Sequence, residues 1–125
     1  MSTVNGLGAR SPLLGLSNGM VGVYKHAFGR GPTKVRSHFA GPDVVVVILE
    51  ATLTAAERNL VALGQHDRLR ELRLIAHRAL EQEIYMLVER VLGRRAVAHV
   101  SGIDLRRDVC AELMMLEPLS LPRRA

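Results

Sequence analysis

The stretch Asp43-Val44-Val45-Val46-Val47-Ile48-Leu49-Glu50 decides the fold of this 125-residue chain. Its β-branched residues predict a strand, because such side chains pack well on a pleated surface. Apolar residues occupy both alternating positions, so we expect both faces to be covered, as they are in a central strand. The dipeptide Gly41-Pro42 predicts a turn immediately before the strand.

Two helices are predicted after this strand. Thr54-Ala55-Ala56-Glu57 fits a capping box, and the helix that it opens is expected to run to Leu63 and to end at Gly64. A longer helix is expected over residues 67–92, with Gly93 as its stop. His77 and Glu81 stand four residues apart on it, and we expect them to form an exposed pair on its surface.

Residues 95–103 and 108–117 are predicted to form a hairpin with Asp104–Arg107 as its polar tip. The second strand alternates, so its residues separate onto two faces. One face would carry Val109, Ala111, Leu113 and Met115, and the other Cys110, Glu112, Met114 and Leu116.

The chain before the central strand is predicted to be mainly helical. Apolar residues recur every three or four positions from Pro12 to Phe28. Three glycines, Gly15, Gly19 and Gly22, each weaken this helix by ~1 kcal/mol relative to alanine. The segment Gly29-Arg30-Gly31-Pro32 ends it, and a short helical turn is expected over residues 33–39.

These elements predict a single α+β domain over residues 12–118, between a flexible arm (1–11) and a short basic tail (119–125). The expected architecture has two layers, with a small antiparallel or mixed three-stranded sheet and helices mainly on one face. The element order is helix, strand, helix, helix, strand, strand. A sheet that is apolar on both faces is difficult to bury in one chain of this size, so we predict a homodimer.

The positive charge is concentrated near the start of the chain. The net charge is +5, and residues 1–42 contain five basic residues and no acidic ones, whereas the remainder contains twelve Arg and twelve Asp or Glu. This asymmetry indicates an anionic partner, which can be an acidic protein surface, a phosphorylated ligand, nucleic acid or anionic lipid.

The candidate site is the glycine-rich basic loop. Its two glycines let backbone amides approach a ligand, and its cations add charge, so it can form an anion-binding nest. It lacks the glycine before lysine that a Walker A loop needs, and it follows a helix instead of a strand. The alternative is a plain helix-to-loop turn with solvated cations. The candidate residues are Gly29, Arg30, Gly31, Thr33, Lys34 and Arg36.

The sequence gives no basis for catalytic residues, a metal site or a cofactor, and we expect a non-enzymatic protein. Recognisable nucleophile and zinc motifs are missing. The single cysteine, Cys110, is predicted to be a buried structural thiol, and His99 to be packed or hydrogen-bonded within its strand. Asp104 and Asp108 are interpreted as turn-forming residues.

The sequence predicts a cytoplasmic protein. Its longest apolar run, residues 44–49, has six residues, whereas roughly 20 are needed to span a bilayer. The mildly apolar stretch 13–23 is interrupted by Ser17 and Asn18 and does not predict a signal peptide.

Several motifs together resemble the MpsC family, which is named for a sodium-translocating, membrane-potential-generating system. They are Tyr24-Lys25, residues 28–34 (Phe-Gly-Arg-Gly-Pro-Thr-Lys), residues 44–50 with Thr52-Leu53-Thr54 and Glu57, residues 92–95 (Leu-Gly-Arg-Arg), and residues 116–118 (Leu-Glu-Pro). The similarity covers about residues 14–118. It implies a small bacterial cytosolic protein linked with cation transport, and it implies no catalytic residue.

Three functions remain open at this point. The first is an accessory or regulatory protein whose basic loop docks on an acidic surface, such as the cytosolic face of a membrane transport complex. The second is a sensor that binds a phosphate or nucleotide at the same loop. The third is weak nucleic-acid binding, which is disfavoured because few aromatic residues are available for base stacking.

Overall fold

The computed structural model describes residues 11–119 and contains one four-stranded antiparallel sheet in the order β1-β2-β4-β3. The strands are β1 (Lys34–Phe39), β2 (Val44–Glu50), β3 (Ala96–Asp104) and β4 (Val109–Leu116). The mixed α+β architecture is confirmed, and β2 lies inside the sheet between β1 and β4. Residues 1–10 of the predicted arm and 120–125 of the predicted tail lie outside the described residues.

The prediction of three strands was wrong because residues 34–39 form a strand and not a helical turn. This segment pairs with β2 from Lys34↔Glu50 to Phe39↔Val45. Gly41 adopts a positive φ of 88° in the connection, a conformation that glycine tolerates, and it lets the chain turn back directly into β2. A six-residue segment is too short for its pattern of apolar and polar residues to predict a strand. Pairing with β2 therefore decides the conformation of residues 34–39.

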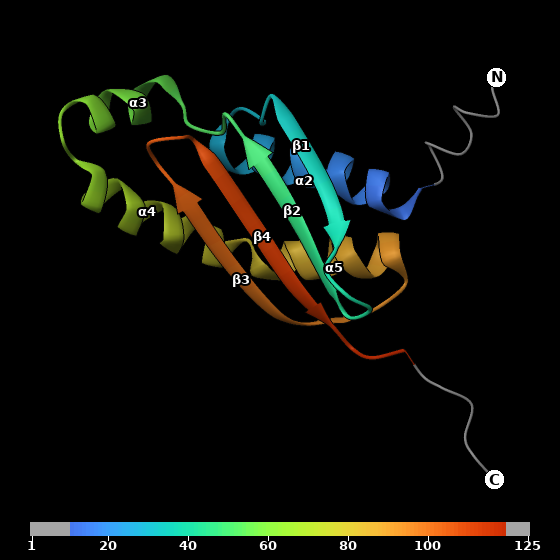
Figure 1. Cartoon of the computed structure of the whole chain (residues 1–125). Helices are drawn as coiled ribbons and strands as arrows, with labels where there is room; N and C mark the ends of the chain where they lie inside the picture. Colours follow the sequence, from blue (N-terminus) through green and yellow to red (C-terminus); the bar gives the residue numbers. More distant parts are fainter. Residues whose placement is uncertain (1–10, 120–125) are drawn as a thin grey trace, which may run out of the picture.

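Within residues 11–119 four helices accompany the sheet: α2 (Pro12–Phe28), α3 (Ala55–Ala62), α4 (His66–Ala79) and α5 (Glu81–Leu92). Ser11 caps α2 with its side chain, and the predicted capping box of Thr54 and Glu57 opens α3. Gly29 and Gly93 take left-handed conformations at the ends of α2 and α5, as expected for glycine stops. Figure 1 shows α2, α4 and α5 behind one face of the sheet, so the other face is open.

The long helix predicted over residues 67–92 is divided into α4 and α5 at Leu80. Leu80 is both the C-cap of α4 and the N-cap of α5, and it lies in the core. No proline or glycine marks the break, so the sequence carries no local signal for it. The division lets α5 pack on α2 while α4 runs along β3.

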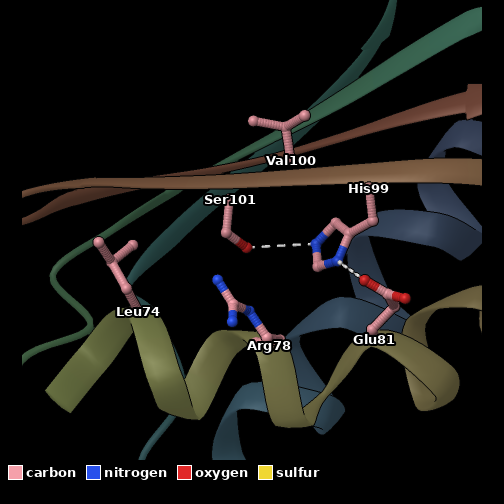
Figure 2. A pocket seen from close by; sticks show the side chains of 6 residues that line it. All are labelled: Leu74, Arg78, Glu81, His99, Val100 and Ser101. Atoms are coloured by element: carbon pink, nitrogen blue, oxygen red, sulfur yellow. Dashed lines mark hydrogen bonds and ion pairs between the residues drawn. The ribbon is translucent and has the colours of Figure 1, made fainter. Parts of the chain in front are cut away.

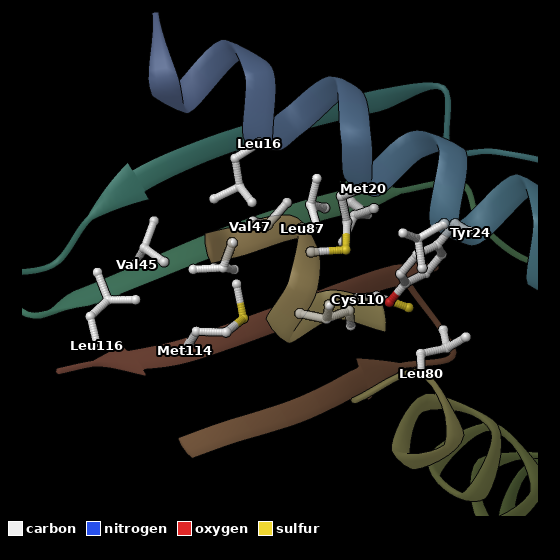
Figure 3. Packing of buried hydrophobic residues seen from close by; sticks show 14 residues of the cluster. Leu16, Met20, Tyr24, Val45, Val47, Leu80, Leu87, Cys110, Met114 and Leu116 are labelled. Atoms are coloured by element: carbon white, nitrogen blue, oxygen red, sulfur yellow. The ribbon is translucent and has the colours of Figure 1, made fainter. Parts of the chain in front are cut away.

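The main core lies between the sheet and the helices α2 and α5 (Figure 3). The predicted alternation of β4 is confirmed, because Cys110, Glu112, Met114 and Leu116 are all buried. In β2 the alternate residues Val45, Val47 and Leu49 are buried, but the residues between them are only half-buried. Within one chain, therefore, only one face of the central strand is covered.

The glycines of α2 allow this helix to approach α5 closely. A Cβ built on Gly15 would lie 3.0 Å from Val91 Cγ1, and one on Gly19 would overlap the side chain of Leu87. Gly22 faces open space instead. Two of the three glycines thus permit the packing on which the helix depends, in addition to lowering its intrinsic propensity.

Across residues 11–119, no helix has both the length and the apolar character that crossing a bilayer requires.

Candidate functional site

One end of the sheet gathers basic residues from three separate segments of the chain. The α2–β1 connection, the start of α3 and the β3–β4 turn all lie at this end (Figure 1). Hydrogen bonds join them, because the Thr33 amide donates to the Glu50 carbonyl at 3.0 Å and the Ala51 amide to the Asp108 carbonyl at 2.8 Å. We call this surface the basic end; its cations are Arg30, Lys34, Arg58, Arg106 and Arg107.

Two of these cations are held in place by the same backbone carbonyl. The guanidinium of Arg58 donates to the Leu53 carbonyl at 2.8 Å, and that of Arg30 donates to it at 3.4 Å. Arg106 and Arg107 stand exposed in the neighbouring turn. The fold therefore places charges from α2–β1, α3 and β3–β4 on one surface before any partner binds.

Most carboxylates near the basic end are committed to contacts within the chain. Asp108 accepts hydrogen bonds from the amides of Thr52 and Leu53 at 2.8 and 3.1 Å. Glu50 pairs with Arg36 at 2.8 Å, and this hydrogen bond lowers the pKa of Glu50. Asp104 is exposed and accepts the amide of Arg107 at 3.0 Å. Among residues 11–119, no ion pair involves a cation of the basic end, so its positive potential is only partly offset.

The predicted site residues are only partly brought together. Arg30 and Lys34 lie at the basic end, whereas Arg36 is occupied by Glu50 on the open side of β1. The amide of Gly29 donates to the Lys25 carbonyl at 2.9 Å and that of Thr33 to Glu50, so two amides of the proposed nest already have partners. Gly31 lies against Val21 and Lys25 of α2.

The sequence alone did not predict Arg58, Arg106 and Arg107 as site residues. They lie in the part of the chain where acidic and basic residues balance in number. The sheet order brings Arg106 and Arg107 to the basic end, because it places the β3–β4 turn beside the ends of β1 and β2.

A buried carboxylate forms a second unusual feature. Glu112 has no solvent exposure and stands on the helix-facing side of β4. The hydroxyls of Tyr24 and Ser101 donate to it, and His99 Nε2 lies 2.5 Å from its Oε1. The hydrogen bond with Glu112 raises the pKa of His99 against the opposing effect of burial, while burial and the nearby carboxylate raise the pKa of Tyr24.

The buried polar groups continue through α4. Arg73 is 1% exposed and donates to Glu57 Oε2 and to the Thr52 carbonyl, each at 2.8 Å. Its guanidinium carbon lies 3.9 Å from the centre of the Phe28 ring. Burial alone would raise the pKa of Glu57, but hydrogen bonds from Arg73 and the Thr54 amide hold that pKa below its usual value. This ion pair ties α4 to the start of α3.

The prediction of an exposed His77–Glu81 pair was wrong, because His77 is fully buried. Its Nδ1 finds no hydrogen-bond partner in the described part of the chain and lies 3.7 Å from Glu112 Oε2, and burial lowers the pKa of His77. Helical spacing places His77 on the buried stripe of α4, because it stands four residues after Arg73 and eight after Leu69.

His99 connects this buried network to an open pocket of about 280 Å³ between α4, the start of α5 and β3. Figure 2 shows His99, Ser101 and Arg78 at the pocket, with the Glu81 carboxylate beside the His99 ring. His99 Nδ1 lies 3.7 Å from Glu81 Oε1, so the imidazole stands between two carboxylates and is suited to hold a proton there. No set of three potential metal-ligating side chains was found among the described residues.

Comparison of the sequence with known proteins identifies the family of this chain. Neither a curated protein nor a solved structure gives a significant match. A family model described as "Na+-translocating membrane potential-generating system (MpsC)" matches residues 15–118, which include every helix and strand described above except the first turn of α2. The chain belongs to the MpsC family.

Proposed function

We propose that this protein is a non-enzymatic accessory or regulatory component of a bacterial membrane-potential-generating cation transport system. In this proposal the basic end docks on an acidic protein surface at the cytosolic face of that system. Family membership supports the link to membrane potential. The gathering of Arg30, Arg58, Arg106 and Arg107 on one surface supports the docking role and is the observation that carries it.

Preorganisation favours this surface for recognition. Arg30 and Arg58 are held by the Leu53 carbonyl, and Asp108 fixes the backbone of Thr52 and Leu53 beside them. Side chains that are already ordered lose less conformational entropy on binding. Charges arranged in this way accelerate encounter with an oppositely charged partner and select it against others.

A phosphorylated small molecule and nucleic acid are the competing anionic partners. The amides of Gly29 and Thr33 are already hydrogen-bonded, which weakens the case for a phosphate nest. Tyr24 is fully buried and Phe28 is packed against the core, so neither offers a face for base stacking. An acidic protein surface needs only the side-chain charges and is the partner that these contacts favour.

The test compares two triple charge reversals in cells that contain the transport system. The site variant is Arg58→Glu/Arg106→Glu/Arg107→Glu, and the control is Arg68→Glu/Arg70→Glu/Arg90→Glu on exposed positions of α4 and α5. Each variant is purified with an affinity tag from detergent-solubilised membranes, and the subunits of the system are quantified by mass spectrometry. We expect the site variant to lose them and the control to retain them, with wild-type recovery falling as salt rises.

Equal recovery with both variants would remove the basic end from the mechanism. A rise in melting temperature with nucleotides or polyphosphate that the site variant abolishes would favour the sensor instead. Salt-sensitive binding of RNA or DNA without recovery of transport subunits would favour the nucleic-acid function.

A further inference from the structure

The face of the sheet that points away from the helices is apolar and uncovered. Met115 is 48% exposed and Val100 is 60% exposed on this face, and the residues around them are half-buried. Figure 2 shows Val100 pointing away from α4, opposite to His99 and Ser101. The strand registers place nine apolar residues together here: Val44, Val46, Ile48, Ala98, Val100, Val109, Ala111, Leu113 and Met115.

Among the described residues, the charged groups of this outer face lie on its edge strands and at the end of β2, where Glu50 pairs with Arg36 at 2.8 Å. The edge strand β1 contributes Lys34, Arg36 and His38, because these residues pair with Glu50, Ile48 and Val46. The opposite edge strand β3 contributes Asp104. One border is therefore basic and the other border carries a carboxylate.

The register also places Lys34 and Asp104 at the same height along the sheet. Lys34 pairs with Glu50, Glu50 with Val109, and Val109 with Asp104, so these residues form one row across all four strands. The next row on this face runs from Arg36 through Ile48 and Ala111 to Gly102. A long basic side chain thus shares its row with a residue that has no side chain, and a Cβ on Gly102 would meet nothing within 4 Å.

We propose that a second copy of this chain covers the outer face, related by a two-fold axis parallel to the strands. Such an axis places β1 of each copy over β3 of the other and keeps every row at its own height. Lys34 then faces the partner's Asp104, and Arg36 faces the partner's Gly102, which leaves room for the guanidinium. Aligned packing of two sheets in this way, about 10 Å apart, is a common architecture.

Other arrangements of two copies fit less well. A two-fold axis perpendicular to the strands would stack β1 on the partner's β1, which brings Lys34 and Arg36 against like charges. Edge-to-edge pairing through β1 or β3 would leave the apolar face in water. The charge pattern and the exposed apolar area therefore select the same symmetry.

This dimer extends the proposed function without depending on it. Because the axis runs along the strands, both basic ends lie at the same end of the dimer. A symmetric partner could then engage two of them at once.

Charge exchange tests the dimer. Analytical ultracentrifugation of the full chain is expected to show a dimer. Lys34→Asp and Asp104→Lys should each lower the affinity of the dimer roughly tenfold, because each substitution creates two like-charge contacts. The variant Lys34→Asp/Asp104→Lys should recover most of the affinity. Met115→Glu, which places a charge in the apolar centre, should give monomers, whereas Met86→Glu on the helical side should have no effect.

Several results would overturn the proposal. One is a wild type that is monomeric at high micromolar concentration, and another is a dimer that survives Met115→Glu. A third is a double variant whose dimer dissociation constant rises by the product of the factors measured for the two single variants. Circular dichroism melting of every variant separates loss of the dimer from loss of the fold. Failure of the wild-type dimer to recover the transport subunits would overturn the proposed function alone.

Discussion

The imidazole Nε2 of His99 lies 2.5 Å from the Glu112 carboxylate, which no solvent reaches. This pair joins β3 to β4, and Tyr24 connects the same carboxylate to α2. An unpaired charge at such a site would be strongly destabilising, so the pair ties the stability of the domain to the protonation of one histidine.

Stability is expected to fall with rising pH because of His99. Its pKa is raised in the folded state by the hydrogen bond with Glu112, so the folded chain binds this proton more tightly than the unfolded chain does. The stabilisation is fully present below the ordinary imidazole pKa of about 6.5 and is lost as pH rises through the higher folded value. Urea unfolding of wild type and His99→Gln should show this decline only in wild type, with exposed His38→Gln as the control.

His77 is expected to act in the opposite direction. Burial lowers its pKa, so the unfolded chain binds this proton more tightly. The corresponding stability is present above the ordinary imidazole pKa and is lost as pH falls through the lower folded value. His77→Phe should therefore reduce the decrease in unfolding free energy below the ordinary imidazole pKa, measured by the same urea unfolding. An unchanged decrease would contradict a lowered pKa for His77.

Replacing Glu112 with alanine is expected to cost about 3–5 kcal/mol of unfolding free energy, because it leaves buried partners unsatisfied. Tyr24, Ser101 and His99 all contact this carboxylate. Glu112→Gln retains acceptor atoms and shape, so it should cost less. Chemical denaturation of both variants at one pH measures the difference, and equal losses would show that shape and acceptor atoms contribute nothing without the carboxylate.

Gly19→Ala and Gly22→Ala form a matched pair. Both substitutions raise helix propensity, yet an added Cβ at Gly19 would overlap Leu87, whereas at Gly22 it meets open space. We expect Gly19→Ala to destabilise by about 1–3 kcal/mol through overpacking. Gly22→Ala should stabilise by about 0.5–1 kcal/mol. A melting temperature below that of wild type for Gly19→Ala and above it for Gly22→Ala would confirm that α2 and α5 meet closely at Gly19.

Asp108 combines an uncommon backbone conformation with a capping role. Its φ is 55°, and its carboxylate accepts the amides of Thr52 and Leu53. Asp108→Asn keeps an acceptor and tolerates the left-handed region, so we expect little change. Asp108→Ala loses both advantages and should cost about 1–3 kcal/mol. Thermal unfolding compares the two, and equal losses would mean that the hydrogen bonds contribute little.

The features that depend on local sequence were predictable. The capping box at Thr54, the glycine stops at Gly29 and Gly93 and the alternation of residues 109–116 follow from short-range rules, and the structure has them. Strand β1 and the break at Leu80 were not predictable, because a pairing partner and packing against the core decide them.

The same division applies to the sites. Arg30 and Lys34 stand out in the sequence because no acidic residue lies near them in the chain. Arg106 and Arg107 join them only through the sheet order. Glu112 was visible as a polar residue on an otherwise apolar stripe, whereas His77 was predicted to be exposed. The conclusion that they are buried together requires β4 and α4 to face one another.

The α3–α4 region is built on a much smaller core than the rest of the domain. Its cluster of fully buried residues contains only Leu53, Leu69 and Leu105, and α3 buries no side chain completely. Its attachment therefore depends on Arg73 and the groups that this guanidinium binds. Amide protons of α3 should consequently exchange with deuterium through local opening, well before those of β2 and β4, and breaking the Arg73–Glu57 contact should speed exchange in α3 while leaving the central strands protected.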